Sequence, residues 1–419
     1  MTISHPANVK IDENNVLASG VDTIVLSFDV LWMNTSLFSV LADLKENAQQ
    51  HGIDYPGQLK HFHPDEVWPF TLKPHGTKGF SWILIGWDFT FKIAAAPEPG
   101  SRPNVMIEIR SEALWRLGPG EAIKIALGLI LVNGGGKIEA KISRLDLCLD
   151  FLMPERLWSA ALMEYAVTRA TDFSPYYHHR KLTGIRIGKG DISARLYDKP
   201  LEIQQQSKKE WMFDVWGLKA IPEGVKIIRI EFQLRREVLK ELGIKTPDNL
   251  LPKIGGAWAY CTKNWLKFQD RPGLHPTQRT TFDWYQEIQD GFKGVQGAEP
   301  LVRQKAVQVD KRRLLQQANG FITSLHAIIQ EEKGTAPDTH VKMDDCLTSY
   351  LDELKKHGPD PSEVKNKLAR KRSKYHRERS MIENGQQSCA EDREEPFTVL
   401  PINRSKENAK ELFNRLLES

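Results

Sequence analysis

The sequence predicts an α+β fold: two fused strand–helix–hairpin–strand units forming one curved, mainly antiparallel sheet with helices on one face, followed by a helical C-terminal region. Two observations predict it. Apolar and polar residues alternate in residues 142–151, 192–199 and 227–236, the pattern of strands that are packed on one side only. The layout of the first 245 residues also repeats, because EALWRLG (112–118) and EVLKELG (237–243) end the two units and align without a gap.

Each unit has the same succession of elements. The first is predicted to contain a strand, a helix, the two strands of a hairpin and a last strand, at residues 22–31, 36–49, 82–85, 89–95 and 104–110. The second is predicted to contain them at residues 142–151, 154–168, 184–187, 192–199 and 227–236. Its helix opens on Pro154, and proline suits the first turn of a helix.

The sequence after the two units has segments of different composition. Residues 246–300 are rich in Trp and Pro and are expected to form short helices capping the sheet, and 301–332 has one apolar helical stripe. The run 365–380 holds eight Lys or Arg against one Glu. It is either a DNA-contacting segment or a disordered solubilising tail. The expected domains are 20–136, 137–245, 246–335 and 336–419.

Composition bounds the class of protein. With 40% hydrophobic and 27% charged residues and a net charge of +4, the chain is predicted to be globular, and any nucleic-acid site must come from local clustering of charge. The four cysteines form no CxxC pair, which favours a reducing cytoplasm. The N-terminal residues lack the apolar core of a signal peptide, and the longest apolar run, 125–132, is too short to span a bilayer. A soluble, cytoplasmic protein is expected.

The polar faces of the three alternating strands converge on one chemistry. They carry Asp146, Tyr197, Lys199 and Glu231, together with several arginines. Carboxylates hold hard divalent metals, a phenol can act as a nucleophile, and guanidinium groups bind phosphate. When the two units are aligned, the first has apolar residues at all four positions: Val25 for Asp146, Ala94 for Tyr197, Ala96 for Lys199 and Met106 for Glu231. The second unit is therefore predicted to be the catalytic one.

Three motifs resemble a known family. SRLDLCLDF (143–151), ARLYDKPLE (194–202) and IIRIEFQLRR (227–236) look like the core motifs of the trans-acting rolling-circle replication initiators, the Rep proteins of plasmids, phages and integrative elements. The resemblance covers about residues 140–245. It implies metal-dependent nicking and joining of DNA, with Tyr197 as the nucleophile that forms a 5′-phosphotyrosyl link. It further implies origin DNA, duplex and single-stranded, as the substrate, a homodimer, and a host helicase and DNA polymerase as partners.

The resemblance also assigns the other site residues. Asp146 and Glu231 would hold Mg²⁺ or Mn²⁺, with Glu202 as a possible third ligand, although strand parity puts Glu202 on the opposite face from Tyr197 unless the strand bends at Pro200. Lys199 is placed to supply a cation near the phenol. The residues expected to bind the DNA backbone are Arg144, Arg195 and Arg229, with Lys371 and Arg372 of the basic run.

Several alternatives remain open at this point. A conjugative relaxase would use the same chemistry, and a non-catalytic DNA-binding regulator would keep the fold without it. His61 and His63 flank one hydrophobic residue and form a competing metal motif, in a stretch that reads as a loop. The run 178–180 (His-His-Arg) is either a DNA contact or an ordinary polar loop.

Overall fold

The computed structural model describes residues 15–61, 66–218, 220–270, 275, 278–292, 299–303, 311–334, 341–369 and 371–372. The chain divides into two compact parts, Met1–Gln304 with Phe397–Ser419, and Lys305–Pro396. We call the described residues of the first part the sheet domain and those of the second the C-terminal helical part, and describe each by itself.

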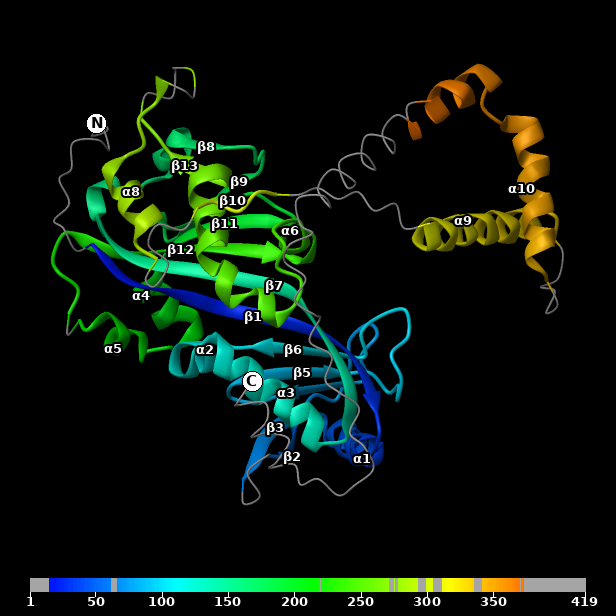
Figure 1. Ribbon diagram of the computed structural model, residues 1–419, viewed down its shortest axis with the longest axis horizontal. Helices are drawn as coiled ribbons and strands as arrows, with labels where there is room; N and C mark the ends of the chain where they lie inside the picture. The colour runs from blue at the N-terminus through cyan, green and yellow to red at the C-terminus, as the bar shows by residue number, and fades with distance from the viewer. Residues whose placement is uncertain are drawn as a thin grey trace, which may run out of the picture. The chain divides into compact units, whose positions relative to one another are not determined.

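The sheet domain is built on one open antiparallel sheet of eleven strands (Figure 1). Two long strands, β1 (Val16–Trp32) and β7 (Gly135–Pro154), pair along its middle. The order from edge to edge is β2 (Tyr55–Lys60), β3 (Val67–Leu72), β4 (Trp82–Ile85), β5 (Phe89–Ile93), β6 (Val105–Ile109), β1, β7, β12 (Val225–Arg235), β11 (Ile192–Asp198), β10 (Lys181–Ile187) and β9 (Phe173–His178). The predicted α+β class with a mainly antiparallel sheet is confirmed.

The two halves of this sheet are arranged alike about the central pair. Reading outward, β1, β6, β5 and β4 on one side match β7, β12, β11 and β10 on the other. The strand registers match as well when the halves are aligned as the sequence suggests, with Val25 on Asp146 and Met106 on Glu231. The pair Val25–Glu108 corresponds to Asp146–Gln233, and the pair Lys92–Met106 corresponds to Arg195–Glu231. Between the two central strands, Val25–Arg144 corresponds to Thr23–Asp146.

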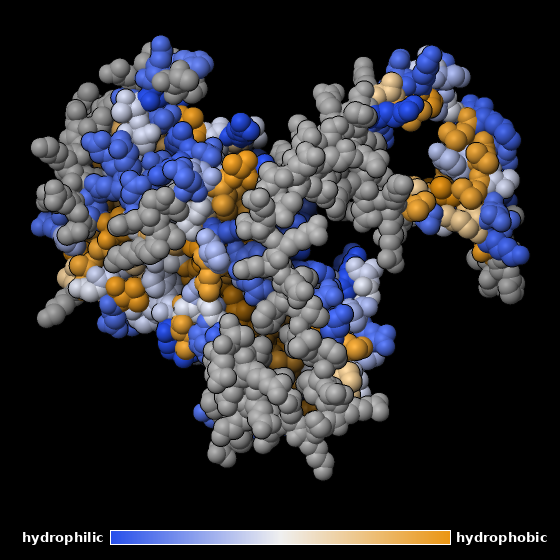
Figure 2. All heavy atoms as spheres, in the orientation of Figure 1, coloured by the Kyte–Doolittle hydropathy of each residue, from blue (hydrophilic) through white to orange (hydrophobic). Residues whose placement is uncertain are grey.

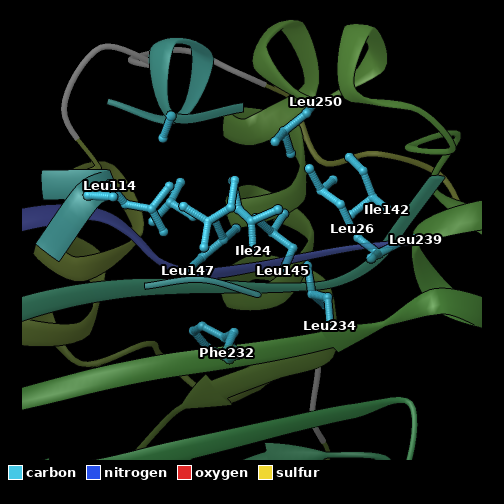
Figure 3. Packing of buried hydrophobic residues seen from close by; sticks show 14 of the residues in the cluster. Ile24, Leu26, Leu114, Ile142, Leu145, Leu147, Phe232, Leu234, Leu239 and Leu250 are labelled. Atoms are coloured by element: carbon cyan, nitrogen blue, oxygen red, sulfur yellow. The ribbon is translucent and has the colours of Figure 1, made fainter. Parts of the chain in front are cut away.

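One face of the sheet carries the main core. Helices cover it: α1 (Ser36–His51), α2 (Ser111–Leu117), α3 (Pro119–Val132), α6 (Arg236–Glu241), α7 (Ile254–Ala259) and α8 (Asp283–Asp290). Leu114 of α2 and Leu239 of α6 pack with strand residues such as Ile24 and Leu145 (Figure 3). The apolar half of each alternating strand is therefore buried, which fixes its polar half on the other face.

The other face is covered at one end by short helices. These are α4 (Lys199–Glu202), a π-helical turn (Ile203–Ser207) and α5 (Met212–Trp216). Ile203, Met212 and Trp216 pack there against Ala18 and Ile227 of the sheet. These short helices therefore cover part of the polar face.

The predicted helix over 154–168 is wrong. β7 continues to Pro154, and two 3₁₀ helices follow, Glu155–Leu157 and Ala160–Tyr165. The short strand β8 (Ala166–Thr168) then pairs with β13 (Leu266–Phe268). Two contacts with distant segments accompany the loss of a continuous α-helix: the Glu155 N–H donates to Gly224 O, and the Trp158 indole donates to Leu182 O.

Residues 246–303 add short helices to the sheet domain. They include the 3₁₀ helices Pro247–Asn249 and Leu251–Lys253, α7, a π-helical turn (Tyr260–Trp265) and α8. Trp258, Trp284 and Tyr285 are buried in the same core as the strands. The expected short helices over the sheet are present.

The C-terminal helical part contains α9 (Lys311–Glu332) and α10 (Met343–His357), which contact each other, and residues 361–369 are also helical. Figure 2 shows hydrophobic residues among hydrophilic ones on its surface, and Phe321 and Leu351 are exposed. Within the described ranges, no helix is both long and apolar enough to cross a membrane.

Candidate active site

Three of the predicted site residues, Tyr197, Glu231 and Asp146, come from adjacent strands and lie on one face. Residues directly opposite in an antiparallel pair share a face. Tyr197 of β11 is opposite Arg229 of β12, and Arg195 is opposite Glu231. Asp146 of β7 is opposite Gln233 of β12. The structure therefore places Tyr197, Glu231 and Asp146 together on the polar face, on the second half of the sheet.

The Tyr197 phenol is bonded to a carboxylate. Its Oη donates a hydrogen bond of 2.9 Å to Oε2 of Glu231. Burial raises the pKa of Tyr197 well above its usual value, and the negative charge of Glu231 adds to the rise. The phenol is therefore protonated at neutral pH, and Glu231 is positioned to accept its proton.

Asp146 lies beside this pair and is fully buried. Arg144 binds both of its oxygens, with Nε 2.8 Å from Oδ1 and Nη2 on Oδ2. Burial raises the pKa of Asp146 to about 7; the hydrogen bond from Arg144 opposes the rise and the negative charge of Glu231 adds to it. Two carboxylates near each other in a buried site are held together only by cations.

One arginine spans the two carboxylates. Nη2 of Arg195 bonds to Oε1 of Glu231 and lies 4.0 Å from Oδ2 of Asp146. Both carboxylates are buried, whereas the Arg195 side chain is 45% exposed. Arg195 therefore has room to turn outward while the two carboxylates stay in place.

The carboxylate pair fits a small hard cation. Mg²⁺ commonly keeps several waters and takes one or two carboxylates together with substrate phosphate oxygens. Asp146 and Glu231 provide that donor set once Arg144 turns away from Asp146 and Arg195 from Glu231, and both arginines are partly exposed. Among the residues that the structure describes, no three His, Cys, Asp or Glu side chains gather into a metal-binding group, so the fit is to an ion completed by water and phosphate.

Glu202 is not part of this pair. The strand ends at Asp198, whose Oδ1 accepts the Leu201 N–H at 3.1 Å and caps helix α4. The alternation of the strand is lost there, and Glu202 instead accepts hydrogen bonds from Lys199 at 2.5 Å and Ser207 at 3.2 Å. The strand does give way to helix α4 at Lys199–Glu202, but this change of direction brings Glu202 to Lys199 rather than to Asp146.

Lys199 is buried beside the nucleophile candidate. Its Nζ lies 5.6 Å from the centroid of the Tyr197 ring, and the side chain is 4% exposed. A cation at this distance from the ring favours the build-up of negative charge on the phenol.

Arg229 is placed differently from the expectation that it holds DNA. It is fully buried under Trp216 and Met212 of α5. Its guanidinium bonds both oxygens of Asp150, at 2.6 and 2.7 Å, and Oδ1 of Asp22 at 2.6 Å. We therefore correct its assignment: Arg229 supports the sheet beneath the site. Asp22 and Trp216 complete this network, and no sequence pattern had connected them with the strand at 227–236.

The other candidates are dispersed. Arg144 is 31% exposed at the site, whereas Lys371 and Arg372 are exposed in the C-terminal helical part. His61 follows β2 and pairs with Glu66 at 3.2 Å, and His63 lies outside the described residues. The stretch 61–70, which read as a loop, includes part of strand β3. His178 ends strand β9 rather than lying in a loop.

No family model matches the chain, and no curated protein matches it. The chain is similar to a structure described as the rolling circle replication initiator protein from Geobacillus stearothermophilus, with 13% sequence identity and a TM-score of 0.38. The match covers 67% of this chain and 98% of that one.

Proposed function

We propose that this protein starts rolling-circle DNA replication by nicking and rejoining one DNA strand, with Tyr197 as the nucleophile. The observation that carries the proposal is the hydrogen bond of 2.9 Å from the Tyr197 phenol to Glu231, next to the buried carboxylate of Asp146. A nucleophile bonded to its base beside a carboxylate pair is the arrangement that phosphoryl transfer to a side chain requires. The three motifs that carry these residues also resemble those of the Rep initiators.

The proposed reaction forms one bond for each bond that it breaks. Oη of Tyr197 attacks the scissile phosphorus while Glu231 accepts the phenolic proton. The bond from phosphorus to the 3′ oxygen breaks, and that oxygen takes a proton from solvent and becomes a 3′-hydroxyl that can prime synthesis. The 5′ phosphate remains on Tyr197. Rejoining reverses these steps and needs no ATP, because the phosphotyrosyl link preserves the bond energy.

The neighbouring residues have distinct parts in this proposal. Asp146 and Glu231 would hold Mg²⁺ or Mn²⁺, which would neutralise charge on the phosphoryl oxygens. Lys199 stabilises the developing phenolate from beside the ring. Arg144 and Arg195, both partly exposed, bind the DNA phosphates on either side of the scissile one. Origin DNA, a second copy of the chain, and a host helicase and polymerase are the proposed partners, and the cytoplasm is the proposed location.

The test is a nicking assay on single-stranded DNA. Labelled oligonucleotides tiled across the region around the gene are incubated with the full-length protein and Mn²⁺, then separated on a denaturing gel. Wild-type protein should give a shortened strand with a 3′-hydroxyl and a covalent protein–DNA adduct. Tyr197→Phe should give neither, because it removes one hydroxyl and no packing.

A matched control comes from the neighbouring edge strand. Tyr177→Phe also removes one phenolic hydroxyl, from an exposed side chain, and should nick as wild type does. Undiminished nicking by Tyr197→Phe would refute the assignment of the nucleophile. Failure of wild-type protein to nick any of the tiled oligonucleotides would refute the proposed function.

A further inference from the structure

We propose that Tyr176 is a stacking platform for a base of single-stranded DNA, so that one nucleotide next to the scissile phosphate is held between Tyr176 and Tyr197. This inference rests on the proposed function, because it places the subsite beside the proposed nucleophile. Three residues build the subsite, one from each of the last three strands of the sheet: Tyr176 on β9, Gly184 on β10 and Tyr197 on β11.

These three residues form one row across the sheet. Gly184 is directly opposite Tyr197 on one side and directly opposite Tyr176 on the other. Since opposite residues of antiparallel strands share a face, Tyr176 lies on the same face as the nucleophile candidate. Tyr177, the next residue along β9, points to the other face.

Gly184 puts no side chain between the two tyrosines, and the Tyr176 ring leans toward it. A Cβ atom at Gly184 would lie 3.3 Å from Cβ of Tyr197 and 3.9 Å from Cδ2 of Tyr176. The two side chains therefore flank a position that has a backbone floor and no side chain of its own. We call this position the tyrosine gap.

The width of the tyrosine gap suits a flat ring. Neighbouring strands lie about 4.8 Å apart, so the backbones of Tyr176 and Tyr197 are separated by about 9.6 Å. When the exposed Tyr176 ring swings up from Gly184 and both rings stand upright on their strands, a base midway would lie about 4.8 Å from each ring, within the range of about 4.5–7 Å over which aromatic rings stack. A purine or pyrimidine of an unpaired strand presents such a ring, whereas the bases of a duplex are already stacked on each other.

The surroundings favour a nucleic acid over another aromatic ligand. In the next row of the same face Arg186 of β10 is directly opposite Arg195 of β11. A nucleotide with its base in the tyrosine gap would have its phosphate within reach of this arginine pair, and guanidinium groups bind phosphate. Tyr176 itself is 49% exposed on an edge strand whose residues are all exposed, so an incoming strand can reach it.

Tyr176 is placed for stacking and not for attack on phosphorus, because in the described part of the chain its phenol has no neighbouring base of the kind that Glu231 provides for Tyr197. The Tyr197 phenol donates to Glu231. Within the described ranges, the structure shows no hydrogen bond from the Tyr176 phenol to a carboxylate. Without a base to take its proton, a phenol is a poor nucleophile at neutral pH, so its ring is the part of Tyr176 that the proposal uses.

The experiment measures stacking directly. Full-length Tyr197→Phe protein, which binds without cutting, is mixed with a set of single-stranded oligonucleotides in which the fluorescent base 2-aminopurine replaces each position in turn. Stacking on an aromatic side chain quenches this base. Quenching is expected at one position next to the nick site, and it should disappear in Tyr176→Ala and remain in Tyr176→Phe, which keeps the ring.

Affinity and turnover supply a second measurement. Loss of a stacking side chain typically weakens single-strand binding about 10-fold. In the Tyr197 wild-type background, Tyr176→Ala should therefore raise KM for the oligonucleotide about 10-fold and leave kcat at saturating DNA nearly unchanged. The matched control is Tyr177→Ala, which truncates a neighbouring tyrosine of similar exposure on the opposite face and should change neither value. Gly184→Ala, which puts a methyl group into the tyrosine gap, should raise KM as Tyr176→Ala does.

Two outcomes would overturn the proposal. Equal effects of Tyr176→Ala and Tyr177→Ala on quenching and KM would show that the tyrosine gap holds no base. A covalent adduct that persists in Tyr197→Phe and is lost in the double variant with Tyr176→Phe would make Tyr176 a nucleophile. The quenching arm needs no cleavage, so position-specific quenching by a wild-type protein that never nicks would refute the proposed function and leave the base-binding site standing.

Discussion

Replacing Arg229 with Met tests whether this guanidinium supports the site rather than touching DNA. Arg229 is 1% exposed and bonds Asp150 and Asp22 at 2.6–2.7 Å. Arg229→Met keeps a long apolar stem and leaves two carboxylates without their positive partner. Breaking a buried ion pair in this way costs about 3–5 kcal/mol. At about 2 °C for each kcal/mol in a domain of this size, the midpoint of thermal unfolding should fall by about 6–10 °C.

The stability lost in Arg229→Met should be larger at neutral pH than at acidic pH. Burial alone would raise the pKa of Asp22, but the charge of Arg229, with smaller contributions from Lys209, Lys199 and Arg195, holds it below its ordinary value of 3.8. A carboxyl whose pKa is lowered by folding stabilises the folded state above its unfolded pKa and loses that contribution as the pH falls through the folded value. The difference in free energy of unfolding between wild type and Arg229→Met should therefore have its full size at pH 7 and become smaller below about pH 4.

The assays are thermal unfolding and urea unfolding, both monitored by tryptophan fluorescence, with single-stranded DNA binding measured in parallel. Arg116→Met is the matched control: Arg116 pairs with Asp88 at 2.6 Å but is 55% exposed, and surface pairs contribute at most about 1 kcal/mol. If Arg229→Met unfolds at the same urea concentration as Arg116→Met and yet binds DNA much more weakly, the buried-support assignment is refuted and Arg229 contacts DNA.

Further predictions concern the metal and the tail. Asp146→Asn and Glu231→Gln should each lose Mn²⁺-dependent cleavage and keep the fold; if both cut normally with Mg²⁺ while His61→Ala does not, the metal site is at the histidines. Burial raises the pKa of Asp146 to about 7 in the folded protein. Above the pKa that Asp146 has in the unfolded chain, its ionised carboxylate therefore lowers the free energy of unfolding. Metal-free Asp146→Asn, which cannot ionise, should resist urea better than wild type at pH 8 and equally at pH 4. Truncation after residue 336 should keep nicking of single strands but weaken duplex binding and flatten its salt dependence, since fewer counterions are released. Identical salt slopes for the full-length and truncated proteins would make residues 365–380 a solubilising tail.

The strands of the site were predictable because their alternation is local. Period-two burial fixes which side chains share a face, so Asp146, Tyr197 and Glu231 were expected on one face before any pairing was known. The equivalence of residues that the alignment predicted is also seen in the strand pairing, since Met106 pairs with Lys92 as Glu231 pairs with Arg195. These features depend only on neighbours along the strand and on repetition of the same unit.

Other features depend on contacts between distant segments and could not be read from the pattern. The apolar residues at 157–162 suit a helix, but the segment is held by distant neighbours through the Glu155 N–H on Gly224 O and the Trp158 indole on Leu182 O. The burial of Arg229 depends on α5, a short helix that packs over it from residues 212–216. The position of Tyr176 beside Tyr197 depends on the pairing of β9 with β10, including an irregularity between Leu182 and Gly184. A strand face alone gave no signal for any of these.

The first half of the sheet has no acids at the positions that correspond to Asp146 and Glu231. The first half of the sheet forms the equivalent ladders with Val25 and Met106 in the places of Asp146 and Glu231. Burying carboxylates costs free energy even when they are paired, and replacing a buried ion pair with apolar residues is often neutral or stabilising by about 1–4 kcal/mol. We therefore expect the double variant Asp146→Val/Glu231→Met to be at least as stable as metal-free wild type at pH 7.

This stability is expected because the arginine partners of the two carboxylates can reach solvent. The side chains of Arg144 and Arg195 are 31% and 45% exposed, so both can turn to water once the carboxylates are gone. The same variant should have lost all nicking while its circular dichroism spectrum matches that of wild type. A double variant that unfolds at markedly lower urea would show that the acids hold the sheet together. Their presence in only one half would then reflect packing, and the case for a catalytic second half would rest on Tyr197 alone.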